Sequence, residues 1–135
     1  MKSRVIFVRF AVIAVFGLSC RAAPAHAVEP TKTEALAAMR AAAAFMADSV
    51  STHGGYVYQY TADLTDRWGE IPARPTQIWT QPPGTPTVGM MLLDAFRATG
   101  DSLFLDCAER AADALVWGQH PAGGWHYLVD FDMPG

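Results

Sequence analysis

Apolar residues recur at helical spacing in three separate stretches of the chain. In the first stretch the apolar positions are alternately three and four residues apart: Leu36, Met39, Ala43, Met46 and Val50. This spacing puts them on one face of a helix, which we expect to run from about residue 33 to residue 50. Thr33 or Thr31 can cap its start, and the Gly54-Gly55 pair is typical of a helix end.

The second and third stretches predict two helices joined by a short turn. A Gly-Thr-Pro run at residues 84–86 opens the second helix, with Thr85 as the expected cap. Gly100 ends this helix and Asp101 caps the next one, which makes a tight helix hairpin. We expect the third helix to end near residue 117 and to carry these residues on its apolar face: Phe104, Cys107, Ala108, Ala111, Ala112 and Leu115.

Aromatic residues alternate with other residues between and after the helices. Tyr56, Tyr58 and Tyr60 predict a short extended segment with three phenols on one side. Residues 61–83 show no clear period, and we expect a long irregular segment that its tryptophans keep ordered. Residues 125–131 alternate again, which predicts a second extended piece.

Residues 41–60 and 111–130 form an internal repeat with an offset of 69 to 70 residues. Both contain an Ala-rich helix end, a short loop, Gly-Gly-aromatic-x-Tyr and an extended segment. Repeats of this period are typical of stacked helix pairs. We therefore predict a mainly α fold: an incomplete α/α toroid-like array of helix pairs, with short extended segments after the Gly-Gly-aromatic loops. On this interpretation residues 28–135 are the N-terminal part of a toroid domain, truncated before its closing helices.

The N-terminal residues predict a cleaved signal peptide over residues 1–27. Three basic residues without an acid come first, an apolar run follows at residues 10–19, and Ala-His-Ala at residues 25–27 suits a signal peptidase. An uncleaved membrane anchor fits less well, because a membrane helix needs roughly 20 apolar residues. Lipidation at Cys20 is a further alternative, although Gly17 fits a lipobox poorly. We expect a periplasmic or secreted protein without a membrane span after cleavage.

Removal of the signal makes the remaining 108 residues acidic. It takes four of the ten basic residues and none of the thirteen acidic ones, which leaves a formal net charge of −7. A nucleic acid is therefore not an expected partner, and an acidic sugar polymer would need a local basic patch or a bridging cation. Cys107 is then the single cysteine, so we expect no disulfide within the chain and a buried thiol.

Four motifs stand out along the mature sequence. They are Gln-Pro-Pro-Gly-Thr-Pro-Thr-Val-Gly at residues 81–89, Ala-Thr-Gly-Asp at 98–101, Gly-Gln at 118–119 and Gly-Gly-Trp at 123–125. Together they resemble secreted bacterial proteins of the pectic acid lyase family, polysaccharide lyase family ten, over roughly residues 54–132. The resemblance implies a helical toroid that cleaves polygalacturonate (pectate) by calcium-assisted β-elimination, with an arginine as the base. No residue here matches that arginine, so catalytic residues are unassigned and enzymatic activity is left open.

Sugar rings have apolar C–H faces that stack on aromatic side chains. We expect the substrate-binding residues to be Trp125, Tyr127, Trp79, Trp68, Tyr58 and Arg67. Alternatively, the aromatic rings fill the core at the helix ends. Asp63 and Asp66 can form a second polar cluster with Arg67, and the alternative for these three residues is loop capping and a surface ion pair. Asp130 and Asp132 lie two residues apart on one face of an extended segment, so they can offer carboxylate oxygens to calcium; the alternative is that they are solvated acids.

These observations favour an extracytoplasmic, polysaccharide-active protein that resembles pectate lyases. One alternative is a non-catalytic fragment or carbohydrate-binding remnant, because the base has no match. Another is a different α/α toroid carbohydrate enzyme that shares the helix pairs and Gly-Gly-Trp. A terpene cyclase would need an Asp-rich motif, for which Asp-Phe-Asp at residues 130–132 is too short. His53, His120 and His126 do not have a metal-binding spacing, and the equivalent positions of His53 and His120 in the repeat favour structural roles.

Overall fold

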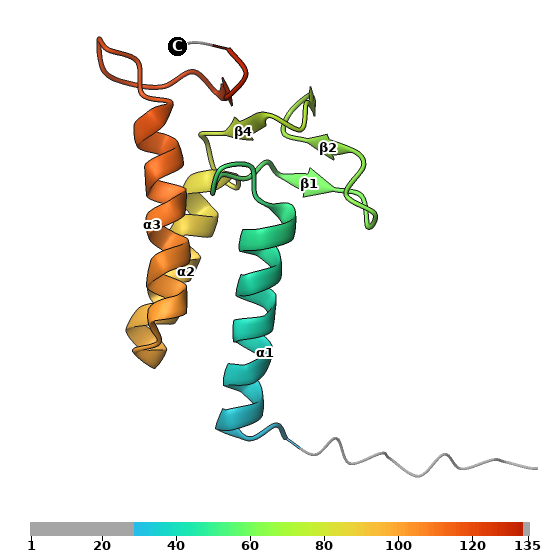
Figure 1. Ribbon diagram of the computed structural model, residues 1–135, viewed down its shortest axis with the longest axis vertical. Coiled ribbons are helices and arrows are strands. Elements are labelled where there is room, and N and C mark those ends of the chain that lie inside the picture. Colours follow the sequence, from blue (N-terminus) through green and yellow to red (C-terminus); the bar gives the residue numbers. More distant parts are fainter. Residues whose placement is uncertain (1–28, 134–135) are drawn as a thin grey trace, which may run out of the picture.

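The computed structural model describes residues 29–133, which contain three α-helices and five short strands (Figure 1). The helices are α1 (Lys32–Phe45), α2 (Thr85–Thr99) and α3 (Ser102–Trp117). A π-helical turn, η1 (Met46–Val50), continues α1. The predicted signal peptide and Cys20 lie outside the described residues. Across residues 29–133, the helices are too short or too polar to cross a membrane.

All three predicted helices are confirmed, and local capping explains most of their ends. Thr31 caps α1: its Oγ1 accepts from the Glu34 backbone N–H at 3.2 Å, and the Glu34 carboxylate accepts from the Thr31 N–H at 2.8 Å. Gly100 adopts a left-handed conformation (φ +71°) after α2, and the Asp101 carboxylate caps α3 through the Leu103 N–H at 3.1 Å.

The predicted role of Thr85 as the cap of α2 is wrong. The capping position is Gly84, and Thr85 is the first helical residue. The Thr85 hydroxyl is fully buried, where it accepts from the Tyr56 N–H at 2.9 Å and donates to the Tyr56 carbonyl at 3.1 Å. This hydroxyl therefore ties the start of α2 to the chain that leaves the first Gly-Gly loop.

Replacing Thr85 with valine is expected to lower the free energy of unfolding by about 1–3 kcal/mol, because the buried Tyr56 N–H then loses its partner. Thr85→Ser keeps the hydroxyl and removes one methyl group, so it should cost about 1 kcal/mol. Urea unfolding of both variants measures the difference. If serine costs as much as valine, the two hydrogen bonds are not what stabilises this junction.

The helical core lies where α1 packs against the α2–α3 hairpin (Figure 1). Its buried members come from α1, η1, α2 and α3: Ala43, Ala47, Leu92, Phe104 and Cys107. The thiol of Cys107 is buried, as predicted, and burial raises its pKa, so it is a packing group rather than a reactive one. On the last turns of α3 the buried residue is Ala114, whereas the predicted Leu115 is only partly buried.

Small antiparallel sheets cover one end of the helices. Strands β1 (Gln59–Tyr60), β2 (Arg67–Trp68) and β3 (Pro72–Ala73) form one sheet, and β4 (Gln77–Trp79) pairs with β5 (Leu128–Asp130) in another. Residues 61–83, expected to be irregular, therefore contain three strands. The fold is therefore mixed, with three helices and small antiparallel sheets, rather than purely helical.

The three alternating tyrosines do not line one open side. Tyr56 is 2% exposed and packs with Val50 and Ala111, and Tyr60 packs against the same cluster. Burial raises the pKa of Tyr56 to about 12, which keeps its phenol neutral. Tyr58 instead packs against Trp79, with ring centroids 5.3 Å apart. The extended part of this segment is limited to residues 59–60.

The two Gly-Gly loops of the repeat have related backbone hydrogen bonds. In the first loop, Thr52 and Gly55 exchange both N–H···O bonds at 2.9 Å. In the second, the His120 N–H donates to the Gly124 carbonyl at 3.1 Å, and the Gly123 N–H donates to the His120 carbonyl at 2.7 Å. The internal repeat is therefore also visible in the turn geometry, with one extra residue in the second turn.

Candidate functional site

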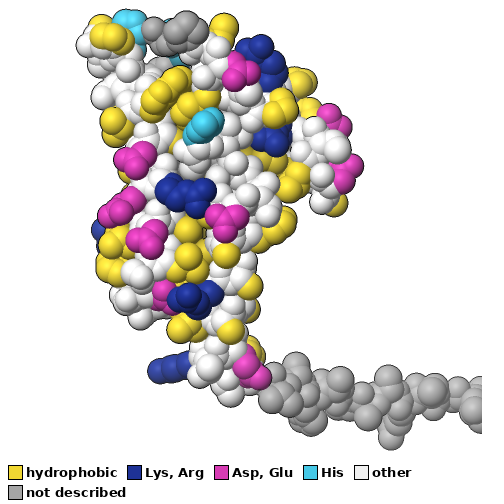
Figure 2. Space-filling view, viewed as in Figure 1, with side chains coloured by type: hydrophobic (Ala, Val, Ile, Leu, Met, Phe, Trp, Pro, Cys, Tyr) yellow, Lys and Arg dark blue, Asp and Glu magenta, His cyan; other side chains and the backbone are white. Residues whose placement is uncertain are grey.

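The C-terminal ends of α1 and α3 lie at the same end of the molecule, beside the small sheets (Figure 1). We call this region the loop end: the first Gly-Gly loop, the last turn of α3, the second Gly-Gly loop and β5. On the face shown in Figure 2, the visible histidine side chains lie in this region among hydrophobic side chains. The loop end therefore collects aromatic, imidazole and polar groups from distant parts of the chain.

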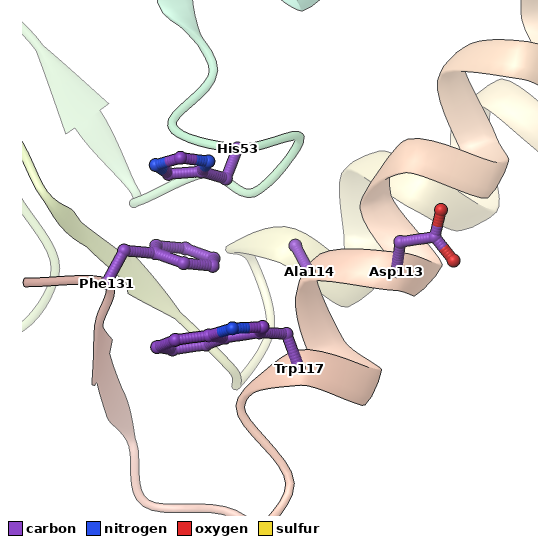
Figure 3. A pocket seen from close by; sticks show the side chains of 5 residues that line it. All are labelled: His53, Asp113, Ala114, Trp117 and Phe131. Atoms are coloured by element: carbon purple, nitrogen blue, oxygen red, sulfur yellow. The ribbon is translucent and has the colours of Figure 1, made fainter. Parts of the chain in front are cut away.

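Three aromatic rings are stacked in a column at the loop end (Figure 3). The Phe131 ring lies between His53 and Trp117, with centroid distances of 4.3 Å and 4.4 Å and interplanar angles of 34° and 30°. His53 is held in a left-handed backbone conformation (φ +51°), which is uncommon for a residue with a side chain. Trp117 remains 50% exposed, so the column presents an immobilised indole to solvent.

Two cavities adjoin Trp117. One, of about 320 Å³, is lined by the ring column together with Ala114 and Asp113, whose carboxylate points away from the rings (Figure 3). The other, of about 590 Å³, is lined by the end of α3, by residues 118–121 and by β5. Its lining includes Trp117, Gln119, His120, His126, Asp130 and Met133. A flat aromatic surface thus borders two hollows that carry hydrogen-bonding side chains.

The larger cavity contains two imidazoles. The rings of His120 and His126 are nearly perpendicular, with centroids 6.2 Å apart. The His120 Nδ1 accepts from the Ala122 backbone N–H at 3.1 Å, so its neutral tautomer carries the proton on Nε2, a donor for a ligand. Neither histidine was among the predicted site residues.

The predicted sugar-stacking residues have different environments. Trp125 and Tyr127 are 48% and 62% exposed, and the Trp125 indole N–H donates to the Leu115 carbonyl at 2.6 Å. Tyr58 and Trp68 are half-buried. Trp79 is 3% exposed and packs over Gly69, where a Cβ atom would lie 2.1 Å from the indole. Trp79 is therefore a core residue rather than a platform on which a sugar can stack.

Arg67 is held by internal contacts. Its Nη1 donates to the Thr52 hydroxyl at 3.0 Å and to the Pro75 carbonyl at 3.3 Å, and its guanidinium lies 5.4 Å from the centre of the Tyr60 ring. These contacts connect the three-stranded sheet to the first Gly-Gly loop. Asp63 accepts from the Thr65 N–H and hydroxyl in a local turn, and hydrogen bonds from Thr61 and Thr65 lower its pKa.

The Asp130 carboxylate is surrounded by donors. It accepts from Arg74, from the Thr76 hydroxyl at 2.8 Å, from the Gln77 amide at 2.8 Å and from the Asp132 N–H at 3.2 Å. Burial raises the pKa of Asp130, but these hydrogen bonds outweigh it and lower the pKa overall, so the group stays anionic. The observed role of Asp130 is to hold β5 against the segment that leads into β4.

The predicted calcium site is not formed by this arrangement alone. The oxygens of Asp130 are used by protein donors, and Asp132 is an exposed residue in the following turn. Within residues 29–133, no three His, Cys, Asp or Glu side chains are grouped as metal ligands. Calcium binding by Asp130 and Asp132 stays a prediction, and it would require the Arg74 ion pair to open.

Comparison with protein-family models, curated proteins and solved structures found no match to this chain. The resemblance to pectic acid lyases therefore rests on its motifs alone. The function has to be argued from the geometry of the loop end.

Proposed function

We propose that this protein binds a polysaccharide outside the cytoplasm, and that the loop end around Trp117 is the binding surface. The observation that carries the proposal is the half-exposed indole of Trp117, fixed by stacking on Phe131 and bordered by two cavities. An immobilised aromatic plane loses little conformational freedom when it stacks on the C–H face of a sugar.

The polar groups around Trp117 suit the edges of a sugar ring. Gln119, His120 and His126 in the larger cavity can donate to or accept from hydroxyl groups. Arg74 forms an ion pair with Asp130 of β5, and its side chain is 59% exposed. Asp130 balances the charge of Arg74, so an acidic polymer such as pectate would have to displace the Asp130 carboxylate to bind this arginine.

The finer proposal is a pectate-lyase-like protein with an α/α toroid and calcium-assisted β-elimination, as the motifs imply. The structure explains part of the motif at residues 81–89 by packing. A Cβ atom on Gly84 would lie 2.7 Å from the Trp79 carbonyl oxygen, and one on Gly89 would lie 3.3 Å from the Ala111 Cβ. This motif therefore supports a shared helix arrangement more directly than a shared reaction, and binding is the function we favour.

The test is the affinity for polygalacturonate, measured by calorimetry or affinity electrophoresis. We expect Trp117→Ala to weaken binding by about tenfold or more, because it removes the stacking surface. Met91→Ala, at an exposed position of α2, is the matched control and should bind as the unchanged protein does. Circular dichroism confirms that both variants are folded. Equal affinity of Trp117→Ala and the unchanged protein would show that polygalacturonate does not bind at Trp117.

Catalysis is tested separately by the ultraviolet absorbance of unsaturated uronates. Polygalacturonate is incubated with the protein in the presence of calcium and, in parallel, with a chelator. Calcium-dependent product would support the lyase hypothesis. Binding without product would favour a carbohydrate-binding role, which is the second candidate because no residue matches the catalytic arginine.

A further inference from the structure

The internal repeat offers a comparison between two equivalent surfaces of the same molecule. The first Gly-Gly loop is covered by α3: a Cβ atom on Gly54 would lie 2.3 Å from the Arg110 carbonyl oxygen. The aromatic residue that follows, Tyr56, packs against Ala111 of α3 and is almost fully buried. The loop and the aromatic residue thus form one side of a tight interface with a helix.

The second Gly-Gly loop has the same features, but residues 29–133 leave it uncovered. Gly123, the equivalent of Gly54 (φ +88°), has φ +85°, and Gly124 has φ +78°. Among the described residues, apart from each glycine and its two chain neighbours, no atom lies within 4 Å of where the Cβ atoms of Gly123 and Gly124 would be. Trp125, the equivalent of Tyr56, is half-exposed, and Val116 in the last turn of α3 is exposed as well. We call residues 116 and 123–125 the open loop surface.

The chain also carries an exposed helix face of the type that fills this interface. Residues 40–45, Arg-Ala-Ala-Ala-Ala-Phe, match residues 110–115, Arg-Ala-Ala-Asp-Ala-Leu, at an offset of 70 residues. In α3 this segment packs on the first loop. In α1 the side opposite the core is exposed and made of small residues and one aromatic residue: Ala37, Ala38, Ala41, Ala42 and Phe45. We call these residues the outer face of α1.

We propose that the outer face of α1 of one molecule docks on the open loop surface of a second copy, so that copies associate head to tail. The template is the interface inside each chain, in which α3 packs on the first Gly-Gly loop. The absence of side chains at Gly123 and Gly124 and the small residues of α1 allow the two backbones to approach closely, as Gly54 and Arg110 do. Trp125, Val116 and Phe45 then leave solvent together.

This arrangement is heterologous, because the two docking surfaces are different and lie on different helices. Each pair keeps one free surface of each kind, so association continues beyond the dimer unless the ring closes. The open loop surface lies within the loop end, next to Trp117, but the proposal does not require that a sugar binds at Trp117. It assigns Trp125 to the contact between copies rather than to a sugar.

The test uses one blocked surface per variant. Ala41→Glu places a charge on the outer face of α1, and Val116→Glu places one on the open loop surface; both positions are exposed, so folding is preserved. Sedimentation velocity over a range of concentrations should show self-association of the unchanged protein. Each variant alone should associate about tenfold or more weakly.

The mixture of the two variants is the decisive measurement. Ala41→Glu retains its open loop surface and Val116→Glu retains its α1 face, so an equimolar mixture should form one heterodimer and no larger species. Ile71→Glu, at an exposed position between β2 and β3, should associate like the unchanged protein. A protein that is monomeric at every concentration, or a mixture that does not pair, would overturn the proposal and indicate that something other than a second copy covers the loop.

Discussion

Gly54→Ala is expected to lower the free energy of unfolding by about 2–5 kcal/mol, combining backbone strain with overpacking. The backbone of Gly54 has φ +88°, a region that residues with a side chain rarely adopt. The added methyl group would also lie 2.3 Å from the Arg110 carbonyl oxygen and 2.6 Å from its carbonyl carbon. These are backbone atoms in the middle of α3, so they cannot move without shifting the helix. Chemical denaturation of the purified protein measures the loss.

Gly123→Ala is the matched control, because it separates strain from collision. Gly123 has nearly the same φ, +85°, but among residues 29–133, apart from Gly123 and its two chain neighbours, no atom lies within 4 Å of the point that the added methyl group would occupy. We expect this substitution to cost only about 1–2 kcal/mol, the strain of a left-handed conformation. If the two substitutions destabilise the protein equally, the contact between the first Gly-Gly loop and α3 does not contribute to stability.

Local sequence signals predict the helices well because capping and periodicity act over a few residues. Thr31 with Glu34, Gly100 and Asp101 satisfy the free backbone groups of helix ends within a few residues of themselves. The prediction of a cap at Thr85 is wrong because the Thr85 hydroxyl hydrogen-bonds to the backbone of Tyr56, which is 29 residues away. Nothing in the residues next to Thr85 indicates that partner.

The strands between residues 59 and 79 escape prediction for a related reason. Each strand has two or three residues, which are too few to show a recognisable alternation of apolar and polar positions. Their stability comes from pairing with other segments: β4 pairs with β5, where Ile78 faces Val129, and both residues are buried. Such pairing depends on the whole fold, so periodicity along the chain cannot predict it.

The sequence could predict that aromatic side chains contribute to the candidate site, but not which of them lie together. Of the aromatic residues predicted to bind sugar, Trp125 and Tyr127 are exposed, whereas Trp79 packs into the core over Gly69. The ring column joins His53, Trp117 and Phe131 from three separate segments. A tryptophan in the last turn of a helix, just before a glycine-rich loop, was the available signal for Trp117.

Phe104→Ala is expected to destabilise the protein by about 3–5 kcal/mol, the cost of a large cavity in a packed core. Phe104 is 1% exposed and belongs to the cluster that joins Ala43 of α1 and Ala47 of η1 to Leu92 of α2. The alanines in this cluster are too short to fill the space. Since a small domain is stable by only about 5–15 kcal/mol, much of the folded population can be lost.

Phe45→Ala provides the comparison for the Phe104 substitution, because Phe45 is 54% exposed on the outer face of α1. At low protein concentration it should change the free energy of unfolding by about 0.5 kcal/mol or less. Urea unfolding followed by far-ultraviolet circular dichroism compares the two variants directly. A similar small loss for Phe104→Ala would mean that α1 is not held to the α2–α3 hairpin by this cluster. A large loss would show that this cluster holds α1 to the α2–α3 hairpin.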